Sequence, residues 1–301
     1  MNVKLENTIA WLYRNGRPLD VARYQYLFLK KDQLLVEKIL KSYQNSDGGF
    51  GHGLEPDSQN PFSSPITTWM AFEVIDELGL DKNHEIVQKT IKYLTEVAPK
   101  RDGLYLSTIP TNNNYPHAPW WTYSPEGSVW GYNPSIAIAG FIYKHHTTKE
   151  QKSQTQELIQ RGINDFLKDP SDNMHEIRAF LDMVNYVGDL ANFNNFKEFL
   201  DKLLEQVEHT LEKNPDLWFK AYCTRPLQYF DKPNTFGYEK FKDLAKLEAS
   251  MILSSLNRDA IWDVTWDWDQ YPEAKVLAMR DWQSSLIIGY LKILNNYDLL
   301  N

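Results

Sequence analysis

The sequence predicts an all-α protein in which six helical hairpins, one of them degenerate, form an α/α toroid with long loops over one mouth. Amphipathic segments such as 191–213 carry apolar residues three and four positions apart, the pattern of a helix with one buried face. Segments such as 136–142 and 286–291 are apolar on nearly every side, which is typical of helices enclosed by other helices. An α/α toroid, which has an outer and an inner ring of helices, contains both kinds of helix. The sequence shows neither a series of short strands nor a βαβ alternation.

The two kinds of helix alternate along the chain. Outer helices are expected at 4–14, 32–44, 83–97, 150–168, 191–213 and 239–256. Inner helices are expected at 18–30, 64–79, 134–147, 174–187 and 280–296, with a weak one at 217–230. No Pro-, Ser- or Gly-rich linker interrupts them, so residues 1–301 are expected to form a single domain. Four connections are long enough to be functional loops: 45–62, 98–132, 214–238 and 257–272.

The connection after the second outer helix reads Gln-Asn-Ser-Asp-Gly-Gly-Phe-Gly over residues 44–51, and the next helix opens at Ser64-Pro65. Ser caps a helix, Pro is tolerated at its first position, and Gly supplies positive φ in the turn. This unit resembles the repeat of the prenyltransferase and terpenoid (squalene-hopene) cyclase superfamily, and the loop 51–57 resembles a single-domain bacterial branch of it. The resemblance implies a toroid that binds an isoprenoid or another apolar small molecule in its central cavity, with acid-initiated cyclisation.

Two acidic clusters could carry that chemistry. His52, Glu55 and Asp57 lie within six residues and could form an acid–base or binding site, or the carboxylates could cap backbone N–H groups. The stretch 262–269 reads Trp-Asp-Val-Thr-Trp-Asp-Trp-Asp, with its three aromatic residues each followed by a carboxylate. Its last part resembles in part the Asp-x-Asp-Asp motif of class II terpenoid cyclases. That resemblance implies Asp269 as proton donor and Asp267 as its support, although Gln270 stands where the last Asp belongs.

A third cluster, 222–230, replaces a regular inner helix and contains Tyr222, Arg225 and Tyr229. Arg225 could bind a phosphate or carboxylate, or it could pair with acidic loops. Aromatic residues make up 14% of the chain and include 10 Trp, which favours either bulky core packing or the wall of an apolar or sugar-binding cavity. The candidates for such a wall lie in loops or inner helices: Trp69, Trp120, Trp121, Tyr123, Trp266 and Trp268.

Composition disfavours several classes of protein. The formal charge of −8, from 40 acidic and 32 basic residues, argues against a nucleic-acid partner. The sequence has no long apolar run and no signal-peptide-like start, so neither membrane insertion nor export is expected. The single cysteine, Cys223, fits a cytoplasmic protein. Metal-ligand spacing and nucleotide-binding motifs are missing, and Ala221 stands where a zinc-dependent prenyltransferase would have Asp, so neither a metal nor a cofactor is expected.

Three functions are therefore open. The first is a terpenoid-cyclase-like enzyme with Asp269, Asp267, Glu55 or Asp57 as acid. The second is a carbohydrate-active hydrolase or lyase, which would use aromatic platforms and a pair of carboxylates. The third is a binding or scaffold protein that keeps the toroid without the chemistry. The sequence does not predict the oligomeric state.

Overall fold

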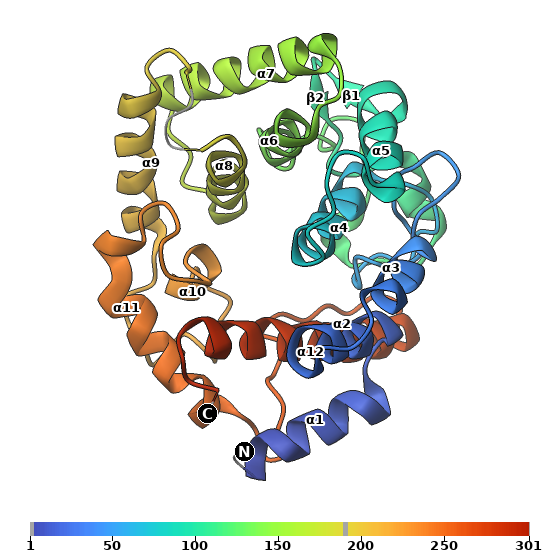
Figure 1. Cartoon of the computed structure of the whole chain (residues 1–301), viewed down its shortest axis with the longest axis vertical. Helices are drawn as coiled ribbons and strands as arrows, with labels where there is room; N and C mark the ends of the chain where they lie inside the picture. The colour runs from blue at the N-terminus through green and yellow to red at the C-terminus, as the bar shows by residue number, and fades with distance from the viewer. Residues whose placement is uncertain (1–2, 189–191, 301) are drawn as a thin grey trace. The chain divides into compact units, whose positions relative to one another are not determined.

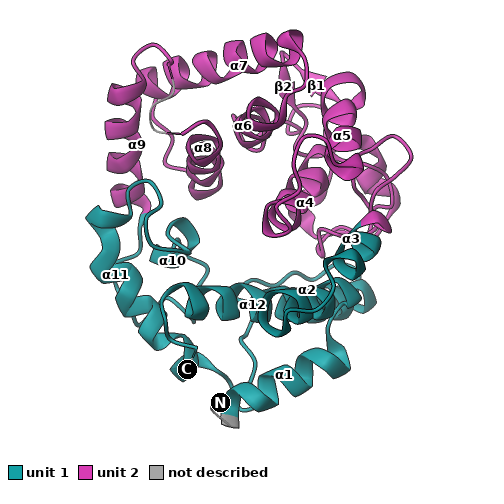
Figure 2. Cartoon of the chain, in the orientation of Figure 1, with its two compact units in different colours: residues 1–40, 211–301 teal, residues 41–210 magenta. Residues whose placement is uncertain are grey.

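The computed structural model describes residues 3–188 and 192–300, which are predominantly helical and so confirm the all-α prediction (Figure 1). The chain divides into two compact units, residues 1–40 with 211–301 (unit 1) and residues 41–210 (unit 2; Figure 2). The closed ring of hairpins and the single domain stay predictions. In the described residues, no helix has both the length and the apolar content needed to cross a membrane.

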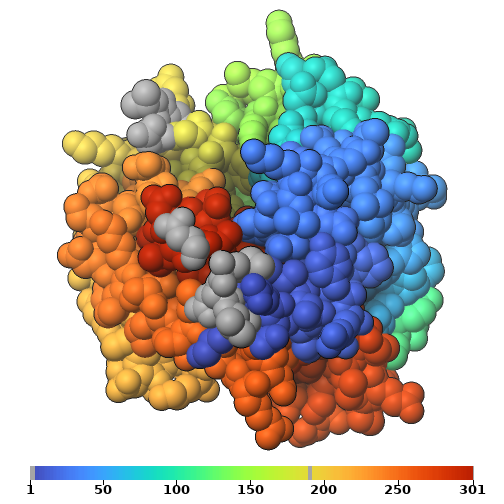
Figure 3. Space-filling view, turned by 60° about the horizontal axis from the view of Figure 1, so that its bottom comes forward, coloured from blue at the N-terminus to red at the C-terminus, as the bar shows by residue number. Residues whose placement is uncertain are grey.

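Unit 1 contains the two ends of the chain. Its helices are α1 (Val3–Asn15), α2 (Pro18–Leu29), α3 (Gln33–Lys41, whose last residue belongs to unit 2), α10 (Pro226–Tyr229), α11 (Tyr238–Met251) with the 3₁₀ turn η4 (Ile252–Ser255), and α12 (Pro272–Asn296). Helix α12 packs against both α1 and α2. Figure 3 shows the face on which the first and last helices, blue and red, lie next to each other.

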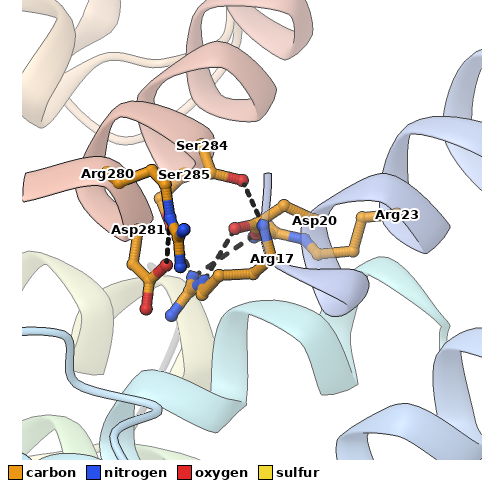
Figure 4. A network of polar contacts seen from close by, with 7 residues as sticks. All are labelled: Arg17, Asp20, Arg23, Arg280, Asp281, Ser284 and Ser285. Atoms are coloured by element: carbon orange, nitrogen blue, oxygen red, sulfur yellow. Dashed lines mark hydrogen bonds and ion pairs between the residues drawn. The ribbon is translucent and has the colours of Figure 1, made fainter. Parts of the chain in front are cut away.

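A buried ionic network joins α2 to α12 (Figure 4). The Asp20 carboxylate is fully buried and accepts hydrogen bonds from Arg17 Nε at 2.8 Å and Arg23 Nη1 at 3.2 Å. Arg17 donates further, from Nη2 to Ser285 Oγ at 2.5 Å and from its backbone N–H to Ser284 Oγ at 3.1 Å. The ion pairs hold Arg17 in place at the start of α2, and the hydrogen bonds from Arg17 to Ser284 and Ser285 link it to α12.

Unit 2 is built around α6 (Ser135–His145). Its other helices are α4 (Pro65–Glu77), α5 (Glu85–Lys92) with the π turn η1 (Tyr93–Val97), α7 (Lys149–Lys168), α8 (Met174–Val187) and α9 (Phe196–Thr210), with the 3₁₀ turns η2 (Pro110–Asn114) and η3 (Pro119–Trp121). Helix α6 contacts α4, α5, α7 and α8, and all its residues from 135 to 142 are buried, as its apolar sequence predicts. Phe141 stacks on Phe72 of α4 at 3.7 Å between ring centroids.

The turn that resembles the superfamily repeat has a specific geometry. Gln44 donates from Nε2 to Gly48 O at 3.0 Å and to Ile86 O of α5 at 3.2 Å, so it ties the turn to α5. Gly48 adopts φ +95°. Gly49 does not have a positive φ, which corrects the prediction for that residue. It is needed for its size, because a Cβ there would lie 2.6 Å from Ser63 Cβ.

Most helix bounds match the predictions within a few residues, but α9 begins at Phe196 rather than at 191. Ser64 caps α4 through a bond from Thr67 N–H. Helix α12 begins at Pro272 instead of 280, and the weak helix at 217–230 shrinks to the four residues of α10. The prediction contained no strand, but β1 (Lys100–Arg101) and β2 (Leu104–Tyr105) form a small hairpin. Residue 191 of the predicted helix 191–213 lies outside the described residues.

The turn geometry leads to a stability prediction. We expect Gly48→Ala to destabilise the protein by about 3 kcal/mol or more, because it combines a positive φ with a clash. The added Cβ would lie 2.1 Å from Lys89 O. Gly79→Ala is the matched control: φ is +61° there, but a Cβ would meet nothing within 4 Å. Its cost should be about 1–2 kcal/mol. If urea unfolding showed the same loss of unfolding free energy for Gly48→Ala and Gly79→Ala, the contact with Lys89 O would not contribute as we expect.

Candidate functional site

Two of the predicted functional loops lie side by side in unit 2. Gln59 N–H donates to Pro116 O at 2.9 Å, and Ala118 N–H donates to Asp57 O at 2.8 Å. Asn60 Nδ2 donates to Asn112 Oδ1 at 2.8 Å. Backbone and side-chain bonds together hold the loops 45–62 and 98–132 as one paired structure.

The paired loops bury the predicted carboxylates. Glu55 and Asp57 are each only 4% exposed, and Glu55 Oε1 accepts a hydrogen bond from Asp57 N–H at 3.2 Å. This bond is the backbone-capping role that the sequence left open. His52 is exposed, with its Nε2 2.9 Å from Asn45 Oδ1. The buried histidine of these loops is His117, which forms a β-bridge with Ser58 and was missed in the sequence analysis.

The tryptophans of these loops have different environments. Trp121 is buried and stacks on Trp130 at 5.3 Å, whereas Trp120 is 37% exposed. Trp69 on α4 and Tyr123 are half-buried. The structure thus places Trp121 near the loop that carries Asp57, because Asp57 pairs with Ala118 three residues before it.

The second predicted cluster, in unit 1, does not provide the surroundings that a proton donor needs. Asp267 is exposed and forms an ion pair with Lys275 at 2.9 Å, which lowers the pKa of Asp267. Asp269 is also exposed, while Trp268 is buried and Trp266 half-buried. An acid that protonates an alkene needs a dry site, because water would otherwise compete for the proton. The structure places Asp267 and Asp269 at exposed positions rather than in such a dry site, and their roles as support and proton donor stay predictions.

The third predicted cluster contains a partly buried cation. The Arg225 side chain is 14% exposed and donates from Nη1 to Tyr290 OH at 2.6 Å. Its guanidinium carbon lies 5.3 Å from the Phe219 ring centroid and 5.6 Å from that of Tyr290. Ring faces attract cations, so these two side chains stabilise the charge of Arg225.

Two more predicted residues lie on either side of Arg225 in the sequence. Tyr222 is exposed and packs edge-on against Trp266 at 6.1 Å between ring centroids. Trp266 in turn packs against Trp282 of α12 at 5.1 Å. Tyr229 is buried in α10 and contacts Phe230. Tyr222 and Trp266, predicted separately, therefore belong to one aromatic surface.

A carboxyl group that was not among the predicted residues, Glu248 of α11, lies next to Arg225. Its side chain is completely buried, and Oε2 accepts a hydrogen bond from Leu227 N–H at 2.7 Å. Oε1 lies 3.6 Å from Arg225 Nη1 and has no hydrogen-bond partner among the described residues. Burial raises the pKa of Glu248 to about 7, although Arg225 and the Leu227 amide act in the opposite direction.

A sequence signal for Glu248 exists. Phe241, Ala245 and Ile252 are all buried, and they stand seven and three residues before Glu248 and four after it. This spacing places a carboxylate on the apolar stripe of an amphipathic helix. Lys and Glu residues are rarely fully buried, so an acidic residue on such a stripe is informative.

A cavity of about 810 Å³ lies in unit 2, and none of the predicted site residues lines it. Phe166 and Phe180 form part of its wall. The ionisable side chains that line it are mostly acidic: Asp165, Asp169, Asp172, Glu176, Glu205 and His209.

Comparison with known proteins provides no independent guide to this site, since no family model, curated protein or solved structure matches the chain. In the part of the chain that the structure describes, no three His, Cys, Asp or Glu side chains are placed to hold a metal ion. Burial raises the pKa of the Cys223 thiol, which favours the neutral thiol over a metal-binding thiolate.

The raised pKa of Glu248 predicts a pH-dependent stability. The folded state binds this proton more tightly than the unfolded state, whose glutamate has a pKa near 4.5. The stabilisation is therefore complete below pH 4.5 and is lost as the pH rises through about 7. We expect the difference in unfolding free energy between wild type and Glu248→Gln to change by about 3 kcal/mol between pH 4.5 and 8, in favour of the variant at pH 8.

Urea unfolding at several pH values measures this difference. Glu239→Gln, at an exposed position of the same helix, is the control and should follow the wild type at each pH. If the unfolding free energies of wild type and Glu248→Gln changed in parallel with pH, the Glu248 carboxyl would have the same pKa in the folded and unfolded states.

Proposed function

We propose that the protein binds an isoprenoid or another apolar small molecule and that Glu248 is the proton donor of an acid-initiated reaction on it. The observation that carries the proposal is a completely buried carboxyl whose Oε1 has no hydrogen-bond partner among the described residues. The resemblance of residues 44–79 to the prenyltransferase and terpenoid-cyclase repeat supports the class of ligand.

The surroundings of Glu248 contain features that stabilise its neutral form and features that stabilise its charged form. Burial favours the neutral acid, so the group holds a proton up to about pH 7. When the proton passes from the carboxyl oxygen to an alkene carbon, a carboxylate and a carbocation form. Arg225 at 3.6 Å and the Leu227 amide then stabilise the carboxylate. Loss of a proton from the cation back to Glu248 completes the cycle.

Aromatic rings near Glu248 suit the cationic intermediate. Tyr290 contacts Arg225, and its ring centroid lies 4.7 Å from that of the buried Trp262. Ring faces stabilise positive charge where water is excluded. Once Glu248 has given up its proton, its negative charge balances Arg225, so the cation does not face an uncompensated guanidinium.

Thermal shift followed by product analysis tests the proposal. A ligand at a hundred times its Kd stabilises the fold by about 2.7 kcal/mol. We expect isoprenoids to raise the Tm. With the isoprenoid that does so, we expect mass spectrometry to detect a product. We expect Glu248→Gln to form this product at least about 100-fold more slowly than the wild type. Glu239→Gln is the matched control and should retain the rate.

Other results would contradict the proposal. Loss of product in Asp269→Asn but not in Glu248→Gln would return the donor role to Asp269. No shift with isoprenoids would favour the scaffold alternative. A shift with oligosaccharides alone would favour glycoside chemistry at the paired loops of unit 2, where one loop buries Glu55 and Asp57 and the other carries the stacked Trp121 and Trp130.

A further inference from the structure

The Arg225 guanidinium has more donors than partners. Of its five N–H groups, those on Nη1 provide the one side-chain hydrogen bond it makes to the described residues, to Tyr290 OH. The side chain is 14% exposed, and Nε and Nη2 form no hydrogen bond with the described residues. The guanidinium therefore presents an open N–H edge while its face packs on Phe219 and Tyr290.

Such an edge matches the geometry of an oxyanion. A guanidinium donates two parallel N–H bonds to a carboxylate or phosphate, and the ring faces hold it in place so that little side-chain entropy is lost on binding. Partial burial strengthens the attraction, because the charge is poorly screened by water. The competing anion is Glu248, whose Oε1 is 3.6 Å from Nη1 and makes no hydrogen bond to the described residues.

We propose that the open edge of Arg225 binds an oxyanion, a phosphate or carboxylate group, and that binding is coupled to protonation of Glu248. A negatively charged Glu248 neutralises Arg225 and repels a second anion. A protonated Glu248 leaves the charge of Arg225 available to the ligand. The ligand in turn makes the Glu248 carboxylate less favourable, so anion and proton bind together. The inference rests on the proposed function only in assigning a proton-exchanging role to Glu248, and needs no isoprenoid.

Four ionisable groups close to Glu248, namely Arg225, Cys223, Tyr290 and Tyr297, do not titrate in the same range. Arg225 stays charged at all pH values of interest, and burial raises the pKa of the Cys223 thiol from its usual 9. On α12 and at its end, burial raises the pKa values of Tyr290 and Tyr297 above their usual 10. Between pH 6 and 8, Glu248 is therefore the member of this cluster that changes charge.

Calorimetric titration with sulfate tests the coupling, since sulfate itself does not titrate between pH 6 and 8. We expect the affinity of the wild type to fall by up to about tenfold per pH unit above pH 7. Two buffers of different ionisation enthalpy should show uptake of close to one proton per sulfate at pH 8. Glu248→Gln should bind sulfate with the same affinity at pH 6 and 8 and without proton uptake.

Two arginine variants localise the site. Arg225→Gln should lose sulfate binding, whereas Arg258→Gln should bind like the wild type because Arg258 is 94% exposed in the same unit. If Arg225→Gln does not fold, the pH-independent binding of Glu248→Gln still decides. Tighter binding of methyl phosphate than of acetate at pH 6 would assign the site to a phosphoryl group, and the reverse to a carboxylate.

The proposal is overturned if the wild type does not bind sulfate, if its affinity is equal at pH 6 and 8, or if Glu248→Gln keeps the pH dependence. These outcomes are independent of the isoprenoid experiments. Sulfate binding without any isoprenoid effect would leave the oxyanion site in place and remove only the proposed function.

Discussion

The transfer of the Glu248 carboxyl from water to the interior of unit 1 is the constraint on which the proposed chemistry depends. Removing an ionised carboxylate from water is expensive, and proteins meet that cost by pairing the charge or by keeping the group protonated. The surroundings of Glu248 combine partial charge pairing with conditions that favour the protonated form. The Leu227 amide and Arg225 favour the charged form, and complete burial favours the neutral one. The balance places the pKa near neutrality, where a small change in surroundings moves the proton.

The same contacts organise the segment between α9 and α11. This segment contains only the short helix α10, and its backbone is fixed partly by a side chain from α11 and by one directly after α12. Leu227 N–H is bound by Glu248, and the Phe230 carbonyl accepts a hydrogen bond from Tyr297 OH at 2.7 Å. An irregular segment at a predicted inner-helix position thus presents Arg225, rather than a continuous helix face, beside the buried carboxyl. Acid, cation and aromatic rings lie together because the regular helix is interrupted.

Much of the fold could be predicted from the sequence, since helix periodicity and caps are local signals. Ser64 caps α4 as expected, and the apolar segment around Ile138 is the buried helix α6. The surroundings of the candidate site residues could not be predicted in this way. Asp267 and Asp269 stood out by motif, but exposure deprives them of the required surroundings. Glu248 was missed because its desolvation comes from residues far away in the sequence, on the segment 211–237 and on α12. Only its position on an apolar stripe was visible beforehand.

The most direct test of this account is the pKa of Glu248 in the folded protein. The carboxyl carbon signal of ¹³C-labelled glutamate can be followed by NMR between pH 4 and 9 and assigned with Glu248→Gln. The account predicts a midpoint at about 7, set by burial against the opposing effects of Arg225 and the Leu227 amide. A midpoint at or below the usual 4.5 would mean that the carboxylate is held as a structural ion, and neither the proton-donor role nor the coupled oxyanion site would stand.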